Sequence, residues 1–294
     1  MIGPFAAPVN ALSKAMSRRH QGRHEPHARS AGSANSRPAG NTGARSAGGT
    51  LPWLWGTHPV LAALANPGRK CRRLAATAEA QRAHASQLAP LLAERRLEAE
   101  TLERASIEAL LPGGALHQGL ALQVEPLPEL AVADLIAATA GRERAVILVL
   151  DQVTDPHNLG AVIRSAAAFG AAGVIVTERH APSETGTLAK AASGALERLP
   201  LVRATNLARA LDELKEGGFW VAGLAADAPV TVAAAKLSGR VTLVLGAEGE
   251  GMRRLTREHC DLLVRLPQTG AVESLNVSNA AAVALYEIVR ETLS

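Results

Sequence analysis

The feature that most constrains this chain is an alternation of short apolar runs with helix-forming segments in its C-terminal half. The apolar runs are rich in Val, Leu and Ile and cover residues 146–150, 174–177, 199–202, 220–224, 241–245 and 262–266. Helical patterns lie between them at residues 159–169 and 206–215, near Met252, and after residue 274. Short apolar strands separated by helices predict a parallel sheet covered by helices on both faces. Ligands of such sheets bind beyond the carboxyl ends of the strands.

The remaining sequence predicts three parts that precede this main domain, which spans residues 146–294. Residues 1–50 are interpreted as a disordered arm, residues 51–125 as a small α/β domain and residues 126–145 as a linker. Within the small domain and the linker, the patterns predict helices at 60–64, 80–94 and 130–138 and strands at 72–76 and 116–124.

The N-terminal arm is strongly basic. Residues 1–50 carry seven Lys and Arg against the single acid Glu25, whereas residues 51–294 carry 24 basic and 26 acidic residues. A segment this rich in Gly, Ser, Ala, Asn and Pro cannot bury enough apolar surface to order itself. We interpret it as an arm that contacts RNA phosphates without sequence preference. An organellar transit peptide is the alternative, although the His, Pro and Gly content gives a poor amphipathic helix.

Two groups in residues 51–125 have open interpretations. The densest basic cluster of the folded part consists of Arg69, Lys70, Arg72 and Arg73. This cluster is either a phosphate-contacting patch or a solvated turn. His58, His117 and Gln118 are interpreted as packing residues, with RNA contacts as the alternative.

Several classes of protein are disfavoured by what the sequence lacks. Cys71 and Cys260 lie far apart without a CxxC pair, which argues against a zinc site and a disulfide framework and fits a reducing cytoplasm. No run of about 18 apolar residues predicts a membrane helix. The GxGxxG turn of a dinucleotide-binding enzyme and the GxSxG elbow of a hydrolase are also missing.

Two motifs follow predicted strands. The first, DQVTDPHNLGAVIR, covers residues 151–164, where Asp155 and Asn158 suit a turn and a helix N-cap and Arg164 lies under two turns along the helix from Asn158. The second, LGAEGEG, has three glycines in residues 246–251, so its backbone amides can face a ligand. The carboxylate of Glu248 suits a cationic cofactor better than a nucleoside triphosphate.

The third motif links the last apolar run to the closing helix. It reads LPQTGAVESLNVSNAAA, and either Ser274 or Asn276 can cap that helix. The polar side chains here lie among Leu, Val and Ala that are expected to be buried, so they need partners from backbone or ligand.

Together, NLGAVIR, LGAEGEG and LPQTGAVESLNVSNAAA, in this order, closely resemble the signature motifs of the SpoU (TrmH) family of the SPOUT class. Members are RNA ribose 2′-O-methyltransferases, and the resemblance covers about residues 146–292. Residues 51–125, with GTHPVLAAL and HQGLAL, resemble the RNA-binding domain of the branch that modifies 23S rRNA guanosine, similar to a small ribosomal-protein domain. The resemblance implies a C-terminal trefoil knot, in which residues 267–273 and the closing helix thread the loop after Leu245.

The resemblance also implies a cofactor, a set of site residues and an assembly. S-adenosylmethionine would be bound by Gly246, Ala247, Glu248, Gly249, Leu266 and Leu275. The catalytic set would be Arg164, Asn158, Glu248, Ser274 and Asn276, with no metal. Arg164 would activate the ribose hydroxyl, but arginine stays protonated in proteins, so stabilisation of the alkoxide is an equally open role. The protein would be a cytoplasmic homodimer with the closing helix at its interface.

We therefore expect methylation of a ribose 2′-hydroxyl in RNA, with a guanosine of 23S rRNA as the leading substrate. A transfer RNA methyltransferase of the same family is the alternative, because such enzymes rely on basic terminal extensions like residues 1–50. A noncatalytic RNA-binding ribosome-assembly factor is the third interpretation. The presence of every motif residue favours an enzyme over that factor.

Overall fold

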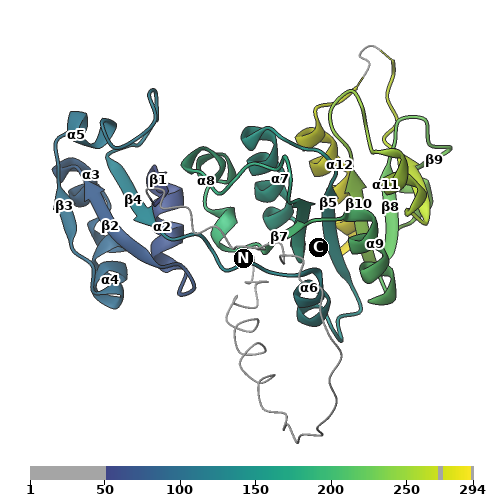
Figure 1. Cartoon of the computed structure of the whole chain (residues 1–294), viewed down its shortest axis with the longest axis horizontal. Helices are drawn as coiled ribbons and strands as arrows, with labels where there is room; N and C mark the ends of the chain where they lie inside the picture. The colour runs from purple at the N-terminus through teal and green to yellow at the C-terminus, as the bar shows by residue number, and fades with distance from the viewer. Residues whose placement is uncertain (1–50, 271–273, 293–294) are drawn as a thin grey trace, which may run out of the picture.

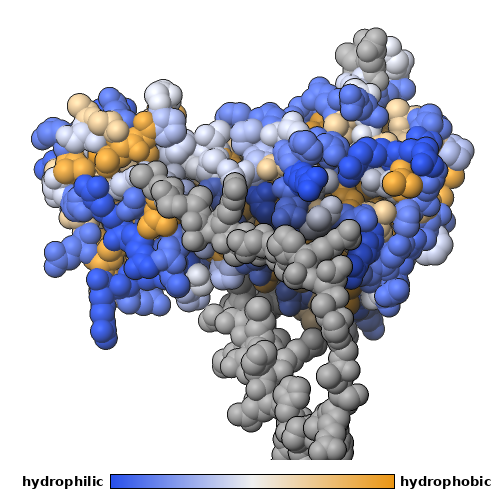
Figure 2. Space-filling view, viewed as in Figure 1, coloured by the Kyte–Doolittle hydropathy of each residue, from blue (hydrophilic) through white to orange (hydrophobic). Residues whose placement is uncertain are grey.

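The computed structural model describes residues 51–270 and 274–292. Figure 1 shows two α/β parts side by side, one built on a four-stranded sheet and the other on a seven-stranded sheet. Hydrophilic residues cover most of the face seen in Figure 2, with apolar residues in several smaller patches. The apolar runs lie in the interior of the structure, as in β5, where Ile147, Leu148 and Val149 are 0% exposed. The basic arm, residues 1–50, lies outside the described residues.

The N-terminal part has the strand order β1-β4-β2-β3. Its strands are β1 (Trp53–Trp55), β2 (Cys71–Ala76), β3 (Ala99–Thr101) and β4 (Leu120–Val124). Its helices are α2 (Thr57–Ala65), α3 (Ala78–Ala83), α4 (Ala85–Arg95) and α5 (Arg104–Glu108). An α/β fold was expected for this part and is confirmed.

Two predicted elements of this part were wrong in extent. The helix expected at 80–94 is two helices, because His84 has φ −113° and ψ 16° and ends α3 before α4 begins. The strand expected at 116–124 begins only at Leu120. Gln118 and Gly119 have φ values of 55° and 79°, which a strand cannot accommodate.

The large sheet is parallel throughout, as expected, with the order β7-β6-β5-β10-β8-β11-β9. Its strands are β5 (Ala145–Leu150), β6 (Gly173–Thr177), β7 (Leu201–Ala204), β8 (Trp220–Leu224), β9 (Val230–Thr231), β10 (Arg240–Leu245) and β11 (Leu262–Arg265). The helices are α6 (Val132–Ala138), α7 (Pro156–Ala168), α8 (Gly186–Ala192), α9 (Leu207–Glu216), α10 (Val232–Ala235), α11 (Arg254–Glu258) and α12 (Val277–Val289). Short 3₁₀ turns cover Ala195–Glu197 and Arg290–Thr292.

Helices cover both faces of this sheet because successive strand residues point to opposite sides. Val146, Leu148 and Leu150 of β5 pack in one core with residues of α7, α8 and α12. Ile147 and Val149 pack in a second core with α6 and α9. A strand buried on both faces is apolar at nearly every position, which explains the nearly continuous apolar runs.

The strand order brings two loops together at one edge of the sheet. β10 pairs with β5 in parallel, and Leu245 lies opposite Leu150 at the carboxyl ends of the two strands. The loops that begin at residues 151 and 246 therefore leave the sheet side by side. The helix α12 packs against α7, which follows the first of these loops. The predicted knot depends on residues 267–273, of which 271–273 lie outside the described part, and its threading stays a prediction.

A buried arginine joins the two parts of the chain. Arg69 is 1% exposed and pairs with Glu197 at 2.6 Å and with Glu184 at 3.2 Å, both in the C-terminal part. Asn66 also donates a hydrogen bond to Glu197 at 2.9 Å. One apolar core runs across the same boundary, from Leu54 and Val60 to residues of α8.

The basic cluster at residues 69–73 is therefore not a continuous phosphate-contacting patch. Arg69 is withdrawn from the surface into the interface. Lys70 and Arg72 both pair with Glu125. Arg73 pairs with Glu100. Each positive charge has an acidic partner, a pattern that the local sequence could not reveal because those partners are 27 or more residues away.

Candidate active site

The first motif places Asn158 in the opening turn of α7. Asp155 is the N-cap of this helix, and its carboxylate accepts a hydrogen bond from the backbone N–H of His157 at 3.0 Å. The cap role therefore belongs to Asp155 and leaves the Asn158 side chain free for other contacts. Asn158 is half-buried and lines a cavity of about 160 Å³ beside Ala247, Glu248 and residues 152–155.

The third motif places Asn276 at the start of α12. Asn276 is the N-cap, and its side-chain oxygen accepts hydrogen bonds from the backbone N–H and the hydroxyl of Ser278, at 2.9 and 2.6 Å. This occupies its oxygen and turns its NH₂ group toward the other motifs. The expectation that either Ser274 or Asn276 caps the helix is thus resolved in favour of Asn276.

The three motifs meet through one side chain. The Nδ2 of Asn276 donates to Oδ1 of Asn158 at 3.0 Å and to Oε2 of Glu248 at 3.4 Å. Asn158 comes from α7, Glu248 from the loop after β10, and Asn276 from the start of α12. Segments up to 118 residues apart in sequence therefore form one polar cluster at the carboxyl edge of the sheet.

The glycine-rich loop after β10 folds back on itself. Ala247 and Gly251 exchange backbone hydrogen bonds of 3.1 and 2.9 Å. A Cβ added at Gly246 would lie 1.9 Å from the carbonyl carbon of Gly251, so glycine is required there. Gly249 and Gly251 have φ of 83° and 69°, and an added Cβ at either would meet no atom within 4 Å. The outer backbone of this turn is therefore open to a ligand.

We expect the Gly246→Ala variant to bind S-adenosylmethionine, the cofactor implied by the motifs, more than about tenfold more weakly, because the added methyl group must displace backbone rather than a flexible side chain. Isothermal titration would measure this affinity. Gly170→Ala is the matched control, because its φ of 71° makes alanine strained while no atom lies within 4 Å of the added Cβ. An equal loss of affinity in both variants would show that general destabilisation, not the loop, is responsible.

A buried carboxylate that sequence reasoning missed anchors the end of this loop. Asp151 is fully buried directly after β5 and accepts hydrogen bonds from the backbone N–H and Nε of Arg253, at 2.9 and 2.8 Å. Its own N–H donates to the carbonyl of Leu245 at 2.8 Å. The two ends of the 246–253 loop are thus tied to the end of β5. An acidic residue ending a buried strand was the available signal.

We expect Asp151→Asn to lower the free energy of unfolding by about 1–3 kcal/mol and to weaken cofactor binding, because a neutral amide loses the charge-assisted bond to Arg253. Chemical denaturation and cofactor titration would measure the two effects. Asp227→Asn removes a carboxylate from another Asp–Arg pair, Asp227 with Arg257, which lies on the surface. If this control weakened cofactor binding as much as Asp151→Asn, anchoring of the loop would not be the cause.

Two predicted catalytic residues lie apart from the polar cluster. Arg164 is exposed on α7, and at about 100° per residue it lies about 240° around the helix from Asn158. Ser274 is exposed, immediately after residues 271–273, which lie outside the described part. Neither side chain has a hydrogen bond to Asn158, Glu248 or Asn276 among the contacts of the described residues.

The predicted cofactor-binding residues surround the glycine-rich loop and the last strand. Gly246, Ala247, Glu248 and Gly249 belong to that loop, whereas Leu266 is half-buried after β11 and Leu275 is exposed before α12. An exposed carboxylate, open backbone amides and apolar side chains fit a ligand that combines a positive charge with a flat apolar group. The 160 Å³ cavity is smaller than the roughly 300 Å³ of a typical ligand pocket, so it accommodates part of such a ligand.

The cysteines contribute no nucleophile to this site. Burial raises the pKa of Cys260 to about 11, so its thiol stays protonated near neutral pH. Burial also raises the pKa of Cys71. Within the described residues, no group of three or more His, Cys, Asp or Glu is arranged to hold a metal ion. None of the helices described there is both long and apolar enough to cross a membrane.

Comparison with known proteins extends these observations. The profile of the SpoU rRNA Methylase family matches residues 145–286, and that of RNA 2′-O ribose methyltransferase substrate binding matches residues 53–130. The chain is 43% identical over 240 residues to the 23S rRNA (guanosine-2′-O-)-methyltransferase RlmB of Photobacterium profundum, covering 81% of this chain and 97% of that protein. The chain belongs to the SpoU family. The predicted family resemblance is therefore confirmed.

Other SpoU proteins also match this chain in sequence or in structure. RlmB of Escherichia coli is 48% identical over 178 residues, covering 60% of this chain and 73% of the relative. The solved SpoU methyltransferase AviRb from Streptomyces viridochromogenes, in complex with the cofactor AdoMet, matches with a TM-score of 0.69 at 27% identity. This match covers 82% of this chain and 90% of AviRb, so both parts of the fold have a SpoU counterpart.

Proposed function

We propose that this SpoU protein transfers a methyl group from S-adenosylmethionine to the ribose 2′-hydroxyl of a guanosine in 23S rRNA. The observation that carries the proposal is the hydrogen-bonded cluster of Asn158, Glu248 and Asn276, which unites the three motifs at the carboxyl edge of the sheet. The names of the RlmB relatives support the substrate, and the AdoMet complex of AviRb supports the cofactor.

The reaction is an in-line displacement: the ribose 2′-oxygen bonds to the methyl carbon as the carbon–sulfur bond breaks, the neutral thioether would leave, and the hydroxyl proton would pass to solvent. The cofactor supplies that methyl group in activated form, on a sulfonium. We assign its binding to the 246–249 backbone, Glu248, Leu266 and Leu275. The protein's remaining task is to align the ribose and stabilise the negative charge that develops on its 2′-oxygen.

The polar residues divide this task by their chemistry. The amides of Asn158 and Asn276, already fixed by hydrogen bonds, would orient the ribose and its phosphate, together with Ser274. Arg164 would stabilise the developing alkoxide, a role open to a side chain that stays protonated. Because Arg164 lies on another side of α7 from Asn158, bound RNA or a second subunit is needed to bring its charge to the reacting atoms.

We also propose a homodimer formed through α12. Val283 and Tyr286, 51% and 52% exposed, present apolar surface on the outer side of this helix. Apolar groups that gather on one exposed helix face commonly mark an interface. Sedimentation of the wild type should give a dimer, and Tyr286→Glu should shift it toward monomer. A wild-type protein that sediments as a monomer at micromolar concentration would overturn this part of the proposal.

The decisive experiment is transfer of labelled methyl from S-adenosylmethionine to total RNA from a strain that lacks this protein, followed by mapping of 2′-O-methylated nucleotides. A single methylated guanosine in 23S rRNA is expected. Methylation of transfer RNA alone would overturn the ribosomal substrate and favour a transfer RNA methyltransferase, the alternative suggested by the basic residues 1–50. Cofactor binding without transfer to any RNA would favour an assembly factor.

A further inference from the structure

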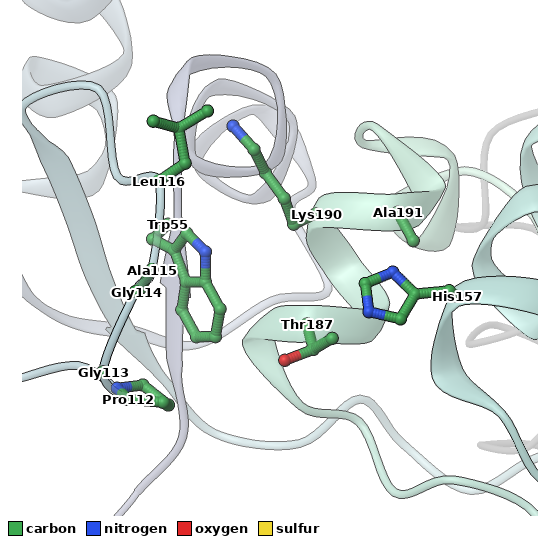
Figure 3. A pocket seen from close by; sticks show the side chains of 10 residues that line it. All are labelled: Trp55, Pro112, Gly113, Gly114, Ala115, Leu116, His157, Thr187, Lys190 and Ala191. Atoms are coloured by element: carbon green, nitrogen blue, oxygen red, sulfur yellow. The ribbon is translucent and has the colours of Figure 1, made fainter.

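A second and larger cavity lies where the N-terminal part meets α7 and α8. Its volume is about 320 Å³, within the range of pockets that hold small ligands. Figure 3 shows Trp55 on one side and His157 on the other, with α8 between them. The lining residues are Trp55, Pro112, Gly113, Gly114, Ala115, Leu116, His157, Thr187, Lys190 and Ala191.

The walls of this cavity combine flat apolar surfaces with one positive charge. The Trp55 ring, the side chain of Leu116 and the His157 imidazole provide the flat and apolar surface (Figure 3). Leu116 is 63% exposed, so its side chain is accessible to a ligand at the mouth of the cavity. No Asp or Glu is among the lining residues, so the charge of Lys190 has no acidic counterpart in the cavity.

Lys190 is held in place without being neutralised. Its Nζ donates a hydrogen bond to the Oε1 of Gln118 at 2.7 Å, and the same oxygen accepts from the backbone N–H of Thr57 at 3.3 Å. The lysine therefore spans from α8 to the N-terminal part and keeps donors available for a further acceptor. Burial lowers the pKa of Lys190, so part of its hydration is already lost before any ligand binds.

The cavity has a well-determined shape on the Trp55 side. A Cβ added at Gly186 would lie 1.9 Å from the Trp55 ring, so the ring packs directly against the backbone at the start of α8. The 112–116 loop runs beside Trp55 on the same side of the cavity (Figure 3), and a Cβ added at Gly113 or Gly114 would meet no atom within 4 Å. The Trp55 wall is thus fixed, and the loop beside it leaves space for a ligand.

The cavity is continuous along the chain with the candidate active site. His157 lines the larger cavity and Asn158 lines the smaller one, so two consecutive residues of α7 face two cavities. Every unit of an RNA chain carries a flat base and a negatively charged phosphate. A strand whose target ribose lies at the smaller cavity can therefore place a neighbouring nucleotide at the larger one.

We infer that the Trp55–Lys190 cavity binds a nucleotide of the RNA substrate that neighbours the methylated one. The base would lie against the exposed Leu116 side chain over the buried Trp55, which is 6% exposed, and Lys190 would bind a phosphate or base oxygen. The inference rests on the proposed function, because it takes RNA as the polymer. The cavity at the junction of the two parts would recognise a flanking nucleotide. This contact would be separate from any contact that the surface of the N-terminal part makes with RNA.

Three variants test this site with little disturbance of the fold. Lys190→Met keeps the length and apolar stem of the side chain but removes its charge. Leu116→Glu adds a carboxylate at the mouth of the cavity, and Leu116→Gln has nearly the same shape without the charge. Arg144→Ala removes an exposed positive charge just before β5, at the amino edge of the sheet, and controls for nonspecific loss of RNA attraction.

Each variant is compared with the wild type for methylation kinetics on an RNA fragment that contains the target, for RNA affinity by fluorescence anisotropy, and for cofactor affinity by calorimetry. We expect Lys190→Met and Leu116→Glu to raise KM and the Kd for RNA about tenfold. The increase for Leu116→Gln should be several-fold smaller. Arg144→Ala should match the wild type. Cofactor affinity should be unchanged in all four.

The outcomes separate this inference from the proposed function. Normal methylation and RNA affinity in Lys190→Met and Leu116→Glu would overturn the inference while leaving the function intact. Equal effects of Leu116→Glu and Leu116→Gln, or of Lys190→Met and Arg144→Ala, would also overturn it, because no specific charge contact would be involved. If the wild type bound RNA without methylating it and the variants still bound tenfold more weakly, the nucleotide site would stand and the proposed reaction would not.

Discussion

Replacing Arg164 with alanine should reduce the methylation rate by about 10²–10⁴-fold, because the transition state would lose the positive charge that stabilises the ribose alkoxide. Arg164 is exposed and has no ion pair among the described contacts, so the fold and the affinity for S-adenosylmethionine should not change. Single-turnover kinetics with saturating cofactor would measure the rate, and calorimetry would measure cofactor affinity.

The matched control for this variant is Arg209→Ala, which also removes an exposed helical arginine, on α9. It should methylate at the wild-type rate. Arg164→Lys tells the two open roles apart, since a lysine retains a positive charge near the oxygen. Partial recovery of rate without a change in the pH profile would favour electrostatic stabilisation over proton abstraction. A wild-type rate in Arg164→Ala would remove Arg164 from the catalytic set.

Replacing Glu197 with alanine should lower the free energy of unfolding by about 3–5 kcal/mol, because Arg69 would remain buried without its main partner. Burial alone lowers the pKa of Arg69, but the hydrogen bond and charge of Glu197 outweigh it and hold the pKa above its usual value. The guanidinium therefore stays charged, and the loss of Glu197 leaves only the partly buried Glu184, at 3.2 Å, to compensate that charge. Urea denaturation would measure the change from the midpoint and slope.

Glu100→Ala provides the surface comparison. Glu100 forms a two-point pair with Arg73, at 2.7 Å for each contact, but both side chains are exposed, so the free energy of unfolding should change little. The double variant Arg69→Met, Glu197→Leu removes both charges and should lose less stability than Glu197→Ala alone. If Glu100→Ala destabilised the protein as much as Glu197→Ala, burial of the pair would not be the cause.

The strands of the large sheet could be predicted from sequence because a doubly covered strand is apolar at nearly every position. β5 shows this most clearly, since all of its residues are apolar and buried and they divide between two cores. The helix α8 was missed because its sequence, GTLAKAA, consists mainly of small residues without an amphipathic pattern. Its small residues allow the close approach to α7, where a Cβ at Gly160 would lie 2.4 Å from that of Ala191.

The candidate site was predictable in composition but not in geometry. Motif resemblance named Asn158, Glu248 and Asn276, yet their shared hydrogen bonds depend on segments brought together only by the strand order. The same holds for Asp151, whose partner Arg253 is 102 residues away. A local pattern also cannot distinguish a buried arginine from a solvated one, which is why Arg69 was grouped with its exposed neighbours.

The ion pair between Arg69 and Glu197 holds the two parts of the protein at a fixed distance from each other. With the two parts joined by a buried charge pair and one continuous core, the distance from the surface that grips RNA to the atoms that modify it is set by the protein rather than by the RNA. Substrates would then be sorted by length as well as by base identity. A base pair inserted in the RNA between the segment bound by the N-terminal part and the target should bring the wrong ribose to the site. Removing the Arg69–Glu197 pair should let the enzyme methylate the RNA with or without the insertion.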